Sequence, residues 1–174
     1  MGLDQGHGDH RRIGWVIRPT ETHFRAGGVG GSCVEASVAA MATVLAMDLA
    51  ATLAAVLLMV VAIFQIALAL GTPLGDAAWG GRHTGVLPIG LRVASAVAGV
   101  VVYPFIVGFV LASAGLITAD WIPGTGAVGM WVLVGFFTVG ALANFASRSK
   151  RERVWGPVSL VIAVCCGVIA VSIA

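Results

Sequence analysis

The feature that most constrains this chain is a set of four apolar segments that carry no charged side chain. They cover residues 49–70, 93–117, 127–146 and 154–174, and none of them contains Asp, Glu, Lys, Arg or His. Each reaches the ~20 residues that an α-helix needs to cross the ~30 Å hydrocarbon core of a bilayer. Because lipid offers the backbone no hydrogen-bond partner, we expect these segments to be helices.

Composition supports the same fold class. The chain is 59% hydrophobic and 10% charged, and its mean hydropathy of +0.99 lies outside the range of soluble domains. The ~10-residue polar–apolar alternation of a membrane β-barrel is missing from the sequence. We therefore predict an all-α integral membrane four-helix bundle, with spans at about 49–70, 89–117, 127–146 and 154–174.

The first 46 residues differ in character from the rest. They are rich in Gly and mix both signs of charge, and we see no helical or strand period in them. This composition predicts a disordered N-terminal arm, followed by one transmembrane domain over residues 47–174. The alternative is that Met41 or Met47 is the true start and that the upstream part is an over-extended reading frame.

The distribution of Lys and Arg predicts the orientation. The connection at 147–153 holds four basic residues, the first connection holds Arg82 and Arg92, and the connection at 118–126 holds none. Basic residues gather in cytoplasmic loops, so both termini are expected outside. Nine Arg against one Lys, with abundant Ala, Gly and Val, is typical of a GC-rich genome. We therefore expect a multi-pass protein of a bacterial plasma (inner) membrane.

The segment 71–92 joins the first two spans and is unusually long for a connection without predicted structure. Its candidates for binding a ligand or a lipid headgroup are Asp76, Trp79, Arg82, His83 and Arg92. In the functional hypothesis the cations bind a phosphate, a headgroup or a carboxylate, Asp76 orients His83, and Trp79 anchors the loop at the interface. In the simpler hypothesis, Arg82 and Arg92 anchor the loop at the membrane surface and Asp76 pairs with one of them.

Polar side chains within the spans are few. Gln65, Tyr103, Thr138 and Asn144 are candidates for lining a pore or a slot. The alternative is plain interhelical hydrogen bonding, worth about 0.6 kcal/mol each. The lack of ionisable groups in the spans argues against a proton- or sodium-coupled transporter and against catalysis within the membrane. We predict no catalytic residue, no metal site and no cofactor.

Small side chains recur at steps of three and four residues along each span, which is typical of closely packed membrane helices. Pro104 interrupts the second span and predicts a kink there. The stripes that we expect to face the bundle are Asp48, Ala51, Ala55, Leu58, Ala62, Gln65, Ala69 and Thr72 in the first span; Ala94, Ala98, Val101, Gly108, Ala112 and Gly115 in the second; Gly129, Leu133, Phe136, Gly140, Ala143 and Ser147 in the third; and Gly156, Ser159, Ala163, Cys166, Ala170 and Ile173 in the fourth.

Three stretches carry a resemblance to a family of small four-helix bacterial integral membrane proteins of uncharacterised function. They are GTPLGDAAWGGRH (71–83), LPIGLRVAS (87–95) and NFASRSKRER (144–153). The resemblance covers about residues 47–174 and implies no activity.

Three functions remain open at this point. The favoured one is a non-enzymatic protein that acts by association in the lipid bilayer, either as a subunit of a membrane complex or with itself. The alternatives are a homo-oligomeric channel or small-solute exporter, and a lipid- or quinone-binding membrane enzyme that uses the 71–92 loop. A net charge of only +2 argues against a nucleic-acid partner. A packed core would favour association. A water-accessible path across the spans would favour a channel, and a slot that ends at the loop would favour a bound lipid or quinone.

Overall fold

A computed structural model describes residues 29–119, 122 and 125–174, and every regular element in these ranges is helical. Four helical segments are long and apolar enough to cross a membrane. The predicted all-α integral membrane bundle is thereby confirmed. The four segments are Cys33–Ala69, Ile89–Ser113, Ala127–Ala146 and Glu152–Ser172.

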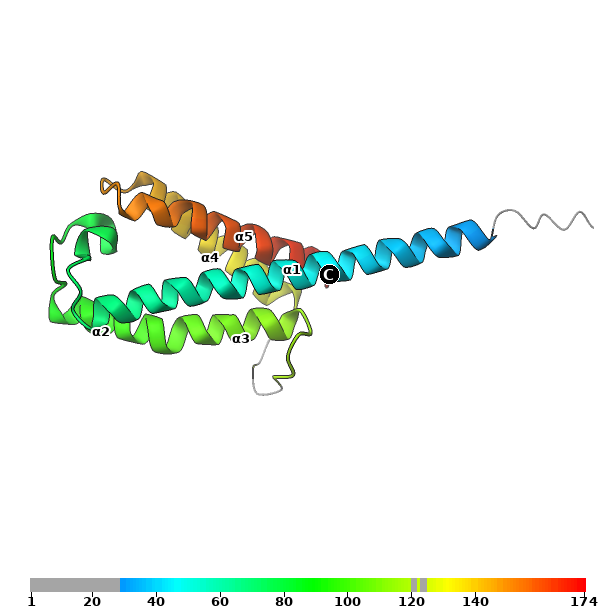
Figure 1. The fold of residues 1–174 in the computed structure, drawn as a ribbon, viewed down its shortest axis with the longest axis horizontal. Coiled ribbons are helices and arrows are strands. Elements are labelled where there is room, and N and C mark those ends of the chain that lie inside the picture. The colour runs from blue at the N-terminus through cyan, green and yellow to red at the C-terminus, as the bar shows by residue number, and fades with distance from the viewer. Residues whose placement is uncertain (1–28, 120–121, 123–124) are drawn as a thin grey trace, which may run out of the picture.

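Helices α1 (Val29–Ala69) and α5 (Trp155–Ser172) form the centre of the bundle. Helix α4 (Ala127–Ala146) packs chiefly on α5, whereas α2 (Ile89–Val97) and α3 (Tyr103–Ser113) pack on α1. The α1–α2 and α4–α5 connections lie together at one end of the bundle, and the C-terminus lies toward the other (Figure 1). We call the first of these the loop end.

Helix α1 is longer than the sequence predicted. It has 41 residues, about 60 Å at a rise of ~1.5 Å per residue, or roughly twice the hydrocarbon thickness of a bilayer. It begins at Val29, so it extends well into the segment predicted to be a disordered arm. Alanine, the strongest helix former, is frequent there and accounts for the difference. The rest of that predicted arm, residues 1–28, lies outside the described residues.

The second membrane segment contains a π turn (η3, Ala98–Val102) between α2 and α3. The Tyr103 N–H donates to the carbonyl oxygen of Ala98, five residues back, and Pro104 follows in the first turn of α3. The predicted disturbance at Pro104 therefore takes the form of a wider turn just before it. Gly99 lies in this turn, where an added Cβ would be 2.9 Å from the carbonyl oxygen of Ala62. Glycine thus lets the second segment approach α1 closely.

The half of the bundle away from the loop end is packed solidly, and we call it the closed half. Its core side chains are fully buried and are small or aliphatic, apart from one methionine: Ala51, Ala54, Leu58, Val110, Met130, Cys166, Ile169 and Ala170. The predicted stripes of α1 and α5 supply the core residues Ala51, Leu58, Cys166 and Ala170, although the fully buried neighbour of Ala51 is Ala54 and not the predicted Ala55. The stripes of the second and third spans agree only in part. Leu133 packs against the core, but Val101 and Phe136 are exposed while Val110 and Met130 are buried.

Candidate functional site

At the loop end, part of the α1–α2 connection folds back onto the α4–α5 connection. Residues 75–82, which we call the cap segment, contain two 3-10 turns, Gly75–Ala77 and Trp79–Gly81. The Ser149 hydroxyl donates to the carbonyl oxygen of Asp76, and the Trp155 indole N–H donates to that of Ala77 at 3.1 Å. The connection for which the sequence predicted no secondary structure is therefore partly helical and docked.

Two glycines make this docking possible. A Cβ on Gly75 would lie 2.8 Å from the carbonyl oxygens of His83 and Gly85. Gly81 has a φ of +64°, and a Cβ there would collide with the side chain of Ser149. A larger residue at Gly81 would separate the two connections, whereas one at Gly75 would force apart two parts of the α1–α2 connection itself.

Glu152 joins the cap segment to the bundle and is almost fully buried, with 6% of its surface exposed. Its Oε1 accepts from the Gly80 N–H at 2.7 Å, and its Oε2 accepts from the Ser147 hydroxyl. In the part of the chain that the structure describes, no cation forms a salt bridge with it. Sequence reasoning missed this residue because it counted only the basic side chains around it. A single acid within RSKRER was the available signal.

Trp79 also ties the cap segment to the second membrane segment. Its indole N–H donates to the hydroxyl of Ser95, which is fully buried, at 3.1 Å. Trp79 has a φ of +55°, a conformation that residues other than glycine rarely adopt. The hydrogen bond to Ser95 helps to hold the ring in this position.

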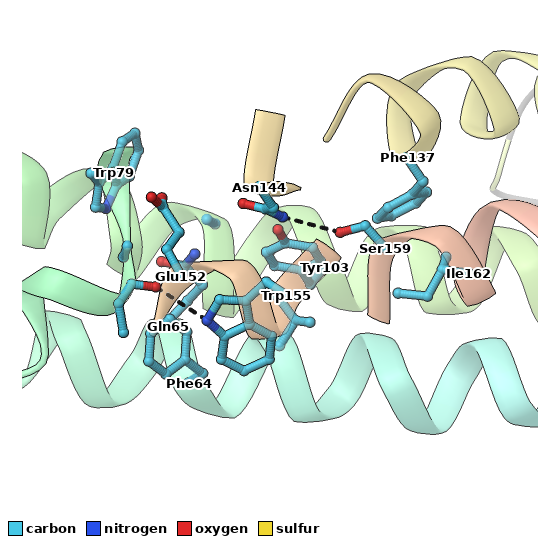
Figure 2. Close-up of a pocket in the computed structure, with 14 residues that line it drawn as sticks. Phe64, Gln65, Trp79, Tyr103, Phe137, Asn144, Glu152, Trp155, Ser159 and Ile162 are labelled. Atoms are coloured by element: carbon cyan, nitrogen blue, oxygen red, sulfur yellow. Dashed lines mark hydrogen bonds between the residues drawn. The ribbon is translucent and has the colours of Figure 1, made fainter. Parts of the chain in front are cut away.

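Beneath the cap segment the helices leave a cavity of about 290 Å³. Figure 2 shows Glu152, Tyr103 and Asn144 around the same space, with Trp155 and Phe64 beside them. All four membrane segments and the cap contribute to its lining, which comprises Val61, Phe64, Gln65, Ala77, Ala78, Trp79, Ala98, Tyr103, Phe137, Asn144, Glu152, Trp155, Ser159 and Ile162.

Three of the four polar residues predicted for a pore or slot meet at this cavity. Gln65, Tyr103 and Asn144 all line it, and the Asn144 amide donates to Ser159 Oγ at 3.4 Å. Thr138 does not join them, since it is exposed and follows Phe137, the α4 residue that faces the interior. Interhelical hydrogen bonding therefore accounts for Asn144, whereas the buried Oε1 of Gln65 has no hydrogen-bond partner in the described part of the chain.

The loop candidates do not form the predicted Asp–His constellation. Asp76 pairs with Arg151, at 3.0 Å between Oδ2 and Nη1. Among the described residues, no hydrogen bond or salt bridge joins Asp76, Arg82 and His83 to one another, and Arg82 is exposed. The Asp76 carboxylate instead contacts the α4–α5 connection, which lies beside it because the two connections are docked.

Arg92 has a structural role. Its Nε donates at 3.0 Å to the carbonyl oxygen of Ala69, the last residue of α1. The final carbonyl groups of a helix lack partners within it, and a cation stabilises that negative end of the helix dipole. Arg92 thus ties the start of the second membrane segment to the end of the first.

Comparison of the chain with protein-family models, with curated proteins and with solved structures finds no match. The cavity and its lining are therefore the basis for assigning a function.

Proposed function

We propose that this protein binds a small molecule in the cavity at the loop end of its membrane bundle. The observation that carries the proposal is a cavity of about 290 Å³ lined by a buried carboxylate, Glu152, and by Gln65, whose buried amide oxygen has no hydrogen-bond partner among the described residues. The volume lies at the lower end of the ~300–1,000 Å³ typical of ligand pockets. A small molecule, or the head of a larger amphipathic one, fits this space.

The two halves of the bundle support binding over conduction. A pore needs polar or open space along the whole length of the spans. In the closed half, however, Leu58, Met130 and Ile169 fill the centre and are fully buried. Thr138, one of the four residues expected to line a pore, lies outside the cavity.

Binding can be tested by recovering the protein from native membranes and identifying small molecules that remain bound, by native mass spectrometry. Ala98→Phe inserts a ring at the cavity wall and should abolish retention. Ala143→Phe, on the exposed face of α4, is the matched control and should retain the molecule. Equal retention by the wild type and Ala98→Phe would contradict the proposal.

We also propose a bacterial inner membrane as the location, with the loop end in the cytoplasm. Between residues 71 and 153, every Lys and Arg lies at that end, either in one of the two connections or in the first turn of α2. Basic residues near membrane spans are retained on the cytoplasmic side. Cys33, exposed at the opposite end, should react with an impermeant maleimide in intact cells. In a Cys33→Ser background, Thr84→Cys should react only after permeabilisation. The reverse pattern would invert the topology.

Self-association is a second candidate, favoured by one observation. Beyond the bundle, α1 exposes Val34, Val38, Met41 and Leu45, each more than half accessible and spaced four, three and four residues apart. This spacing is that of a coiled-coil seam. In a parallel pair of α1 helices Val38 would lie opposite Val38 of a second copy, so Val38→Cys in a Cys33→Ser background should give a disulfide-linked dimer on mild oxidation of membranes. Cys33→Ser alone is the control and should give none, and monomer alone from the Val38→Cys protein would argue against this candidate.

A further inference from the structure

Three hydrogen-bond donors around the cavity are already engaged by the protein. The Trp79 indole N–H donates to Ser95 and the Trp155 indole N–H donates to Ala77. The Asn144 amide donates to Ser159. Among the described residues the hydroxyl groups of Tyr103 and Ser159, which also line the cavity, donate to no acceptor, but the three N–H groups named above are not available to a ligand.

Acceptor capacity, by contrast, is left over. The Oε1 of Gln65 is buried without a partner. Each oxygen of Glu152 accepts one hydrogen bond from the protein, one from Gly80 and one from Ser147. A carboxylate offers about four acceptor positions, so it can take further donors from a ligand.

The charge of the lining has one sign. Among the described residues that line the cavity, Glu152 is the one with a charged side chain. The nearest basic neighbours in sequence have other partners: Arg151 pairs with Asp76, and Arg153 donates to the carbonyl oxygen of Ser147 at 2.8 Å. A positively charged group is therefore favoured beside Glu152.

Aromatic rings complete the surroundings. The rings of Phe64 and Trp155 lie 4.5 Å apart between centroids, and Trp79, Tyr103 and Phe137 supply further ring surface (Figure 2). The face of an aromatic ring carries partial negative charge and attracts cations. The same rings also accept an apolar body.

We infer that the ligand of this cavity is a protonated amine carried on a small apolar body. The inference rests on the proposed binding function and names the chemical class that the cavity takes. The ammonium N–H groups donate to Glu152 and to Gln65 Oε1, while the apolar body lies among the rings. Such an amine has two sources, a free amine from water or the ethanolamine headgroup of a membrane lipid.

The probe is n-hexylamine, titrated calorimetrically into the full-length protein in phosphatidylcholine nanodiscs, with empty nanodiscs as the blank. Hexyltrimethylammonium carries the charge without N–H donors, and hexanol carries a donor without the charge. We expect hexylamine to bind at least tenfold more tightly than either. Equal affinity of hexylamine and hexanol would overturn the assignment to amines.

Variants locate the effect at the cavity. Glu152→Gln keeps the size and an acceptor but removes the charge, so hexylamine should bind at least tenfold more weakly while hexanol is unaffected. Gln65→Leu removes the unpartnered oxygen and should weaken hexylamine more than hexyltrimethylammonium. The matched control Asp76→Asn removes a carboxylate at the same end but outside the lining and should change the affinity less than twofold. If Glu152→Gln and Gln65→Leu both bind hexylamine as the wild type does, the inference fails.

Two further measurements separate the possible failures. If hexanol and hexylamine bind alike and Ala98→Phe abolishes both, the cavity binds small molecules but does not select amines. If Ala98→Phe leaves all binding unchanged, the proposed function fails as well. Adding phosphatidylethanolamine to the nanodiscs identifies the source: competition with hexylamine indicates the lipid headgroup, and an unchanged affinity indicates a free amine.

Discussion

The closed half and the loop end of this bundle are built from the same four membrane segments, yet they pack differently. In the closed half, Ala51, Ala54 and Cys166 are fully buried because small side chains let the helices approach closely. At the loop end, large rings such as those of Phe64, Trp155 and Tyr103 stand around a cavity. One half thus holds the helices together, and the other leaves space among groups able to bind a ligand.

The contrast extends to polar groups. The core of the closed half is formed by nonpolar residues, with the buried hydroxyl of Ser113 at its far end, whereas the loop end buries Glu152, Ser95 and a Gln65 oxygen without a partner among the described residues. A buried acceptor without a donor costs about 1–3 kcal/mol. That cost is removed if a bound ligand supplies the donor, which is why we place function at this end.

Truncating matched side chains should show the largest difference between the halves. Leu58→Ala removes a fully buried side chain of the closed half and should lower the free energy of unfolding by about 2–5 kcal/mol. Val61→Ala, one turn further along α1, only enlarges an existing cavity and should cost about 1 kcal/mol or less. Thermal unfolding in detergent measures both. Equal losses would mean that the two halves are packed alike.

Detaching the cap segment should have an intermediate effect. Glu152→Ala leaves the Gly80 N–H and the Ser147 hydroxyl without their acceptor, at a cost of about 1–3 kcal/mol. Amide hydrogen exchange over residues 75–82 should accelerate, while exchange in the closed half stays unchanged. Glu35→Ala, at the exposed start of α1, is the control. Unaltered exchange of residues 75–82 would show that Glu152 does not hold the cap.

The smallest effect is expected at the end of α1. Arg92→Met keeps most of the side-chain length but removes the hydrogen bond to the Ala69 carbonyl, and should lower stability by about 0.3–1 kcal/mol. Arg82→Met removes an exposed cation with no bond to a helix end and should be neutral. The difference in melting temperature between the two variants is the measurement. A larger loss for Arg82→Met would mean that we have assigned the cap of α1 to the wrong arginine.

The membrane segments could be predicted from the sequence because charge is excluded from lipid, which marks their extent directly. Their facing sides were harder to predict. The stripes containing Ala51 and Cys166 lie in the core, but Val101 and Phe136 are exposed where the sequence placed them inside. In lipid both the inward and outward faces of a helix are apolar, so hydrophobic periodicity does not separate them.

The candidate site was predicted only in part. Gln65, Tyr103 and Asn144 stood out as polar residues in apolar spans, and they do line one cavity. The partner of Asp76 is Arg151, which lies 75 residues away in sequence, and no local spacing predicts such a pair. Glu152 could have been noticed as the single acid within RSKRER, but its partner Gly80 could not, since that contact depends on the docking of two distant connections.

The π turn before Pro104 contains one residue more than the corresponding turn of an α-helix. The second membrane segment therefore has the same geometry as a helix into which one residue has been inserted. Each residue of an α-helix rotates the chain by about 100°, so a deletion within Ala98–Val102 would turn the two ends of this segment against each other. Ser95, which holds Trp79, and Tyr103, which faces the cavity, lie on opposite sides of that turn. A single-residue difference in length at this point would thus be enough to change the shape of the cavity while all of its lining side chains were kept.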